Sequence, residues 1–178
     1  MLTDSHLRKA AAGLCPARAF AIVARYRMES SVSEAAPRIV LDTNVCLALF
    51  LYADPACAAL RGLLGWHRAV ANAATRGEWL RVLQQGRFPF QQEHRLAAAT
   101  AFDQCTLQLD AAPRGILLPR CRDPDDQKFL ELARDTGAVA LVTRDRELLR
   151  LARRTRRTAG FDVLTPEALA GGPGSMAL

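Results

Sequence analysis

The sequence predicts one α/β domain with a central, mostly parallel sheet that helices cover on both faces. Its length of 178 residues corresponds to a single domain. Half of the residues are apolar and 24% are charged, which is the balance of an ordinary globular protein. Short apolar runs rich in β-branched residues alternate with helical patterns along the chain. Such alternation implies right-handed βαβ units and therefore a parallel sheet.

The first strand is predicted at 38–41, an apolar run that contains Ile39 and Val40. Asp42 ends this run, and an apolar helix is predicted at 45–52. The segments that follow alternate between helical patterns and short strand-like runs. We expect helices at 55–64, 75–85 and 91–102, and strands at 68–71 and 106–109.

The last third of the chain has the clearest pattern. A helix is predicted at 124–136, and Gly137 follows it at the position where a left-handed residue commonly closes a helix. We expect the remaining elements to be a strand at 138–143, a helix at 146–153, a strand at 161–164 and a helical turn at 166–170.

The two ends of the chain differ from this pattern. Residues 1–37 lack a strand signal and end in a stretch rich in Ser, Ala and Pro. We expect a flexible N-terminal extension at 1–37, a folded domain at 38–172 and a tail at 173–178. Met28 is an alternative start upstream of the folded part.

Composition excludes several classes of protein. The longest uncharged stretch in the most apolar region, 43–53, is too short to cross a bilayer. The five cysteines are odd in number and contain no C-x-x-C pair, which argues against a zinc ribbon or a redox pair. The N-terminus lacks a secretory pattern, so we expect a cytoplasmic protein. The net charge of +6 favours a polyanionic partner such as nucleic acid.

Four carboxylates fall at informative places in this pattern. Asp42 and Asp145 follow two predicted strands, and Glu78 and Asp126 lie in the predicted first turns of two helices. Ligands of open parallel sheets bind beyond the carboxyl ends of the strands. We therefore expect the four side chains to meet at one edge of the sheet.

Each of these acids also has a simpler interpretation as a helix cap. Thr75 and Glu78 have the spacing of a capping box, and Asp123 followed by Pro124 places Asp126 at the third helical position. Capping does not require the helix starts to converge, whereas metal binding does. Four carboxylates on one edge would also repel one another without a cation. The sequence leaves both interpretations open.

A cluster made only of carboxylates suits a hard cation, Mg²⁺ or Mn²⁺. Such an ion activates water and stabilises charge on a phosphodiester. None of the three histidines lies in these segments, so an imidazole base is not indicated. Asn44, two residues after Asp42, is expected either to orient Asp42 or to cap the next helix.

Several segments resemble those of the PIN-domain family, and specifically its VapC-like ribonucleases, the toxins of toxin–antitoxin systems. Residues 39–44 resemble the opening of a PIN domain, and residues 121–133 resemble the central motif of this subfamily. Residues 142–145 resemble the T-x-D motif after the fourth strand, and residues 78–83 resemble the helix with the second acid. The likeness covers about 38–170 in the expected order.

This resemblance implies a small three-layer α/β/α fold and a Mg²⁺- or Mn²⁺-dependent endoribonuclease that cleaves single-stranded RNA. It also implies a cognate antitoxin protein and a homodimer. By position it implies a catalytic and metal-binding set with three supporting residues. The set is Asp42, Glu78, Asp126 and Asp145, and the supporting residues are Asn44, Thr143 and Asp123. The segment before Glu78 departs from the family pattern, so Glu93 is an alternative to Glu78.

Seven arginines lie between 144 and 157. A cluster that begins beside Asp145 is expected to bind an RNA backbone through bidentate phosphate contacts, with Arg144, Arg146 and Arg150 as the candidates. The alternative is a solvated helix end, where cations are favoured by the helix dipole.

Two other functions fit parts of this pattern. One is a Mg²⁺-dependent phosphatase of the haloacid-dehalogenase type with Asp42 as nucleophile, although such enzymes have a second Asp where this chain has Asn44. The other is a non-catalytic module that binds RNA or a partner protein and uses its acids only as helix caps.

Overall fold

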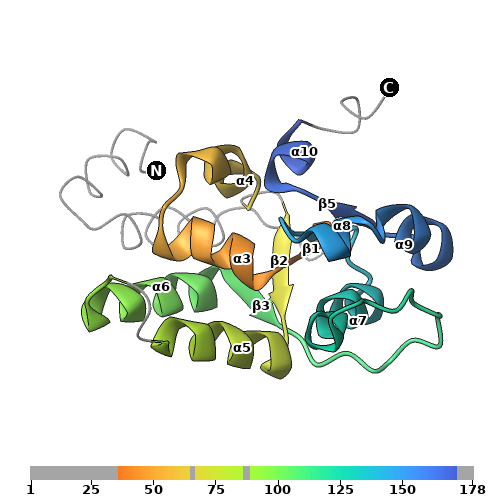
Figure 1. The fold of residues 1–178 in the computed structure, drawn as a ribbon, viewed down its shortest axis with the longest axis horizontal. Helices are drawn as coiled ribbons and strands as arrows, with labels where there is room; N and C mark the ends of the chain where they lie inside the picture. The colour runs from red at the N-terminus through yellow and green to blue at the C-terminus, as the bar shows by residue number, and fades with distance from the viewer. Residues whose placement is uncertain (1–35, 65–66, 86–88, 172–178) are drawn as a thin grey trace.

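The computed structural model describes residues 36–64, 67–85 and 89–171. In this part of the chain, five strands form one sheet in the order β3-β2-β1-β4-β5, and every neighbouring pair is parallel. Helices lie on both sides of the sheet (Figure 1). The predicted three-layer α/β/α architecture is therefore confirmed.

Strand β1 (Arg38–Leu41) is the centre of the sheet, between β2 (Arg68–Ala71) and β4 (Ala140–Val142). The edge strands are β3 (Thr106–Gln108) and β5 (Asp162–Leu164). All five lie within or next to the predicted strand segments. Because they are parallel, the loops that follow β1 and β4 emerge at the same edge of the sheet.

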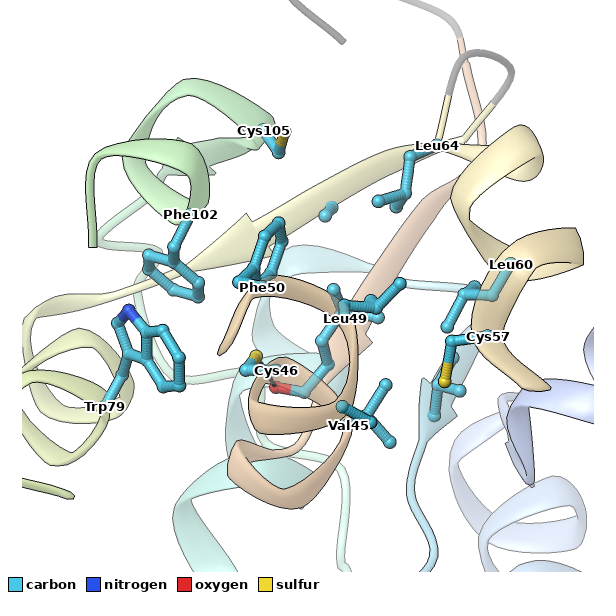
Figure 2. Packing of buried hydrophobic residues seen from close by; sticks show 14 of the residues in the cluster. Val45, Cys46, Leu49, Phe50, Cys57, Leu60, Leu64, Trp79, Phe102 and Cys105 are labelled. Carbon is cyan, nitrogen blue, oxygen red and sulfur yellow. Dashed lines mark hydrogen bonds between the residues drawn. The ribbon is translucent and has the colours of Figure 1, made fainter. Parts of the chain in front are cut away.

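One face of the sheet packs against the helices of the first half of the chain and the last helix. These are α3 (Thr43–Cys46) with the π-helical turn Leu47–Leu51, the 3₁₀ turn Pro55–Cys57, α4 (Ala58–Leu63), α5 (Ala73–Gln84), α6 (Gln92–Cys105) and α10 (Pro166–Ala170). Three aromatic rings fill the centre of this layer (Figure 2). The ring centroids of Phe50, Trp79 and Phe102 lie 5.6–6.2 Å apart. Their contact attaches α5 and α6 to the helix that follows β1.

The opposite face packs against the helices of the second half. These are the 3₁₀ turn Pro124–Asp126, α7 (Gln127–Thr136), α8 (Arg146–Leu149) and α9 (Ala152–Ala159). Val40 and Leu141 from the sheet are fully buried against Phe129 and Leu130 of α7. Gly137 ends α7 with a φ of 66°, which confirms the predicted left-handed closing residue.

The start of α5 differs from the prediction. Asn72, not Thr75, is the N-cap: the Asn72 side chain accepts a hydrogen bond from Thr75 N, and Thr75 Oγ1 accepts one from Asn72 N. Ala73 and Ala74 are good helix formers and extend the helix by nearly one turn toward β2. Glu78 therefore lies in the second turn of α5 rather than in its first.

The predicted helix at 146–153 is also wrong as a single element. The chain forms α8, turns at Arg150 and Leu151, and starts again as α9. Leu151 is buried in the core at this turn. Arg146 and Arg153 are therefore not on one face of a continuous helix.

The described residues begin just before β1, where Pro37 O accepts a hydrogen bond from Arg68 N. Residues 1–35, Met28 included, and 172–178 lie outside the described residues, so the expected extension and tail stay predictions. Within the described segments, no helix alone has the length and apolar character to cross a membrane. The consecutive helices Thr43–Leu51 and Pro55–Leu63 meet that test only together, and they are bent by 107°.

Candidate active site

Asp42 follows β1 at the carboxyl edge of the sheet, beside the end of β4. Its backbone N–H donates to Val142 O at 3.0 Å, which extends the parallel pairing by one residue. The Asp42 side chain is buried, with 4% of the residue exposed. This pairing places the Asp42 carboxylate next to Thr143 and the loop that leads to Asp145.

Two side chains hold the Asp42 carboxylate. Thr143 Oγ1 and Asn44 Nδ2 each donate to Asp42 Oδ2 at 2.5 Å. Asn44 Oδ1 in turn accepts from Arg144 N at 3.2 Å. The side chain of Asp42 makes no capping bond to α3, so its burial is not explained by helix capping. These bonds fix the direction of the carboxylate.

Asp145 has a structural role that the capping interpretation predicts. Its Oδ1 accepts from Glu147 N at 2.7 Å and from Leu148 N at 3.1 Å, and so caps α8. Its own backbone N–H donates to Thr143 Oγ1 at 2.9 Å. Thr143 therefore links the two carboxylates that follow β1 and β4, and both capping bonds leave Oδ2 of Asp145 unused.

Asp126 lies at the end of the 3₁₀ turn that precedes α7 and is partly buried. The pKa of Asp126 is raised to about 6, most strongly by burial and then by the negative charges of Asp42, Asp123, Asp145 and Glu78. These carboxylates are thus close enough to act on one another. Asp123 itself caps the 3₁₀ turn by accepting from Asp125 N, as its N-cap pattern predicts.

The pKa of Asp42 is also raised. Burial is the largest cause, and the carboxylates of Glu78 and Asp145 add to it. The hydrogen bond from Thr143 and the nearby Thr43 backbone N–H act in the opposite direction, because they stabilise the ionised form. The net direction shows that negative charge at this position is costly without a cation.

Glu78 is bound by two residues that the sequence analysis did not single out. Its Oε1 accepts from Thr43 Oγ1 at 2.5 Å, and its Oε2 forms an ion pair with Lys128 Nζ. Glu93, the alternative, is an exposed residue in the first turn of α6 and is not among the charges that shift the pKa of Asp42 or Asp126. Glu78 is therefore the glutamate of this cluster.

One signal in the sequence could have pointed to Lys128. The chain has 24 basic residues, and only Lys9 and Lys128 are lysines. Lys128 also lies two residues after Asp126, inside the most distinctive motif of the chain. Thr43 lies between Asp42 and Asn44 and offered a hydroxyl at the same edge.

The donor set suits a hard cation, because it consists of carboxylates with hydroxyl and amide groups and has no imidazole. In the described part of the chain, however, no three His, Cys, Asp or Glu side chains come together as a group that could hold a metal ion. The four carboxylates as a shared ion site therefore stay a prediction.

The predicted RNA-binding arginines differ in their surroundings. The guanidinium of Arg144 donates to Asp54 Oδ2 at 3.0 Å and to Glu167 Oε1 at 2.8 Å, and these partners raise its pKa. Arg150 is exposed and pairs with Glu147, and Arg146 is exposed at the start of α8. A phosphate would have to compete for Arg144 but would reach Arg146 directly.

The comparison with known families decides the assignment of the fold. The family model of the PIN domain matches residues 38–147, which is more than half of the chain. The chain belongs to the PIN-domain family. The match begins at β1 and includes Asp42, Glu78, Asp126 and Asp145. PIN domains are generally nucleases that use divalent metal ions. No curated protein gives a significant match to the sequence.

Proposed function

We propose that this PIN domain is a Mg²⁺- or Mn²⁺-dependent endoribonuclease that cleaves single-stranded RNA, and that Asp42 is its central acidic residue. The observation that carries the proposal is the setting of Asp42. It is buried at the carboxyl edge of the sheet and held by Thr143 and Asn44, and its pKa is raised by burial and by neighbouring carboxylates. A buried, oriented carboxylate without a cationic partner is a typical metal ligand.

Asp42, Asp126 and Asp145 are the residues that would hold the ion, and Glu78 lies beside them. A bound divalent ion would supply an activated water and stabilise the charge that develops on the phosphodiester. Thr143 and Asn44 keep the Asp42 carboxylate in one direction. Asp126, with a pKa of about 6, gives up its proton near neutral pH and becomes an anionic ligand.

The surface next to this cluster supports an RNA substrate. Helix α8 follows Asp145 directly, and Arg146 and Arg150 are exposed at its start and at its end. Arginine guanidinium groups bind phosphate oxygens with bidentate geometry, and such contacts position a backbone without reading its sequence. The substrate preference for a single strand comes from the family resemblance.

The proposal includes a biological role as the toxin of a cytoplasmic toxin–antitoxin pair. It rests on the resemblance of residues 121–133 to the central motif of VapC-like toxins. A cognate antitoxin and a homodimer belong to the same proposal. A small open reading frame beside the gene, whose product abolishes cleavage when it is co-expressed, would support this role, and light scattering would test the dimer.

The two alternative functions fit the site less well. A phosphatase of the haloacid-dehalogenase type needs a second carboxylate where Asn44 donates to Asp42. A module that uses its acids only as caps would have the Asp42 side chain capping the backbone of α3, and that side chain makes no capping bond.

The test is cleavage of a labelled single-stranded RNA with Mg²⁺, Mn²⁺ or EDTA. We expect cleavage with either ion, none with EDTA, and at least a roughly thousandfold loss in Asp42→Asn, as is typical when a central catalytic group is removed. Asp103→Asn is the matched control, because Asp103 pairs with Arg76 on the surface of α6 and is not among the charges acting on Asp42. Circular dichroism must show that both variants are folded. Metal-independent cleavage, or an active folded Asp42→Asn variant, would refute the proposal.

A further inference from the structure

Lys128 places a positive charge inside the acidic cluster. It lies in the first turn of α7, and its Nζ pairs with Glu78 Oε2 on α5. The two side chains are only 21% and 16% exposed. Water screens such a pair less than a surface ion pair, so the interaction is stronger than most surface salt bridges.

The other oxygen of the same carboxylate also has a protein partner. Glu78 Oε1 accepts from Thr43 Oγ1 at 2.5 Å. A divalent ion that takes Glu78 as a ligand would therefore bind an oxygen that already interacts with Lys128 or Thr43. Lys128 is the competitor of like charge, so it is the one that a cation would repel.

We propose that Lys128 is an internal counter-cation that competes with the divalent ion for Glu78. This inference rests on the proposed function, because it takes Asp42, Asp126 and Asp145 as the ligands that receive the ion. Lys128 neutralises Glu78 while no ion is bound and withholds that carboxylate from the ion. As a positioning residue, it sets the affinity of the site for metal.

The choice of lysine fits this role. A lysine ammonium is a compact charge on a flexible stem, whereas an arginine would hold a carboxylate with two parallel bonds. Lys128 is one of two lysines in a chain with 22 arginines among 24 basic residues. Its Nζ lies 5.2 Å from the centroid of the Phe129 ring and donates to Asp125 O. These contacts give the ammonium a favourable place when it leaves Glu78.

The experiment is a double-mutant cycle on the full chain, with Mn²⁺ binding measured by calorimetry in metal-free buffer. Lys128→Met keeps the apolar stem and removes the charge. We expect it to raise Mn²⁺ affinity roughly tenfold, within the usual range of coupling between sites. Glu78→Gln should change affinity by about twofold or less in the wild-type background. In the Lys128→Met background it should reverse most of the tenfold gain, because only there is Glu78 available to the ion.

Arg122→Gln is the matched control. It removes one positive charge from the same stretch of chain, but its side chain is 82% exposed, so screening should limit the change to about twofold. The melting temperature without metal is a second measurement. It should fall in Lys128→Met, because Glu78 loses its counter-ion, and should hardly change in Arg122→Gln.

The outcomes separate this inference from the proposed function. If Asp42→Asn abolishes Mn²⁺ binding but Lys128→Met leaves affinity unchanged, the inference alone is wrong. If Lys128→Met raises Mn²⁺ affinity equally with Glu78 and with Gln at position 78, the inference is also wrong. The effect would then come from the removal of a positive charge and not from the release of Glu78. If Asp42→Asn binds as tightly as the wild type, or if no variant binds millimolar Mn²⁺, both proposals fail.

Discussion

The two halves of the acidic cluster are held in different ways. The residues that follow β1 and β4 are held by hydrogen bonds: Thr143 Oγ1 links Asp42 Oδ2 to Asp145 N. On the helices, Glu78 accepts a hydrogen bond from Thr43 and also pairs with the charge of Lys128 across α5 and α7. Hydrogen bonds give a carboxylate one direction, whereas an ion pair can exchange one cation for another. The strand half is therefore preorganised, and the helix half can adapt to a ligand.

Among the variants that distinguish the two halves, Thr143→Val should produce the largest effect, and it tests the strand half directly. The hydroxyl of Thr143 is fully buried and serves both Asp42 and Asp145. Removing a residue that orients a metal ligand typically lowers metal affinity or activity tenfold to a hundredfold. We therefore expect a loss of roughly that size in RNA cleavage. The free energy of unfolding should fall by about 2 kcal/mol.

Thr136→Val is the control for that variant. Thr136 is equally buried, but its hydroxyl donates to Leu132 O within α7 and does not contact the cluster. We expect a loss of stability of about 1 kcal/mol and unchanged cleavage. If both variants lose activity equally, the loss reflects general destabilisation, and the claim that Thr143 preorganises Asp42 is broken.

The pH dependence of stability tests the charges of the helix half. The pKa of Asp126 is about 6 in the folded protein and has an ordinary value near 3.8 otherwise. Between these values Asp126 binds more protons in the folded state than in the unfolded state, so its contribution to metal-free stability falls as the pH rises from about 4 to about 6. The expected loss is about 1 kcal/mol, reduced from the full shift because Asp126 is partly exposed.

Denaturant unfolding in EDTA at pH 4.5 and pH 7 measures this loss. Asp126→Asn should remove the share of Asp126 from the pH dependence. The raised pKa of Asp42 leaves a contribution of the same sign, whereas the lowered pKa values of Asp54, Asp135 and Glu167 act in the opposite direction. Adding Mn²⁺ at pH 7 should raise the free energy of unfolding of the wild-type protein again, since the ion binds only the folded state. If the free energy of unfolding had parallel pH profiles in the wild type and in Asp126→Asn, the other carboxylates would not raise the pKa of Asp126.

Asn72→Ala should have the smallest effect. It tests whether Asn72 caps α5, which decides the helical turn in which Glu78 lies. The Asn72 side chain caps α5, so its removal should cost about 1 kcal/mol of stability. Cleavage should change little, because Glu78 is held by Thr43 and Lys128 as well as by its helix. Gln91→Ala is the control, since Gln91 is the N-cap of α6 but makes no side-chain capping bond. Equal stability of the two variants would favour a helix start at Thr75.

Much of the candidate site was predictable because it follows strand ends. Asp42 and Asp145 come after two apolar β-branched runs, and parallel strands bring such positions to one edge. The cap at Asp123 and the turn at Gly137 were predictable as well, because both depend on neighbours within a few residues. The start of α5 was not, since Asn72 and Thr75 are both acceptable N-caps and only the packing of the helix selects one.

The sequence by itself determined the α/β architecture, the order of its elements and the acids that follow its strands, because hydrophobic periodicity and turn residues act over short distances. Only the tertiary structure decided which groups meet. The hydrogen bond between Asp42 and Thr143 joins residues 101 positions apart, and the bond between Thr43 and Glu78 joins residues 35 apart. The pairing of Lys128 with Glu78 depends equally on how α5 and α7 pack. Such contacts follow from the relative placement of whole helices, which no local pattern encodes.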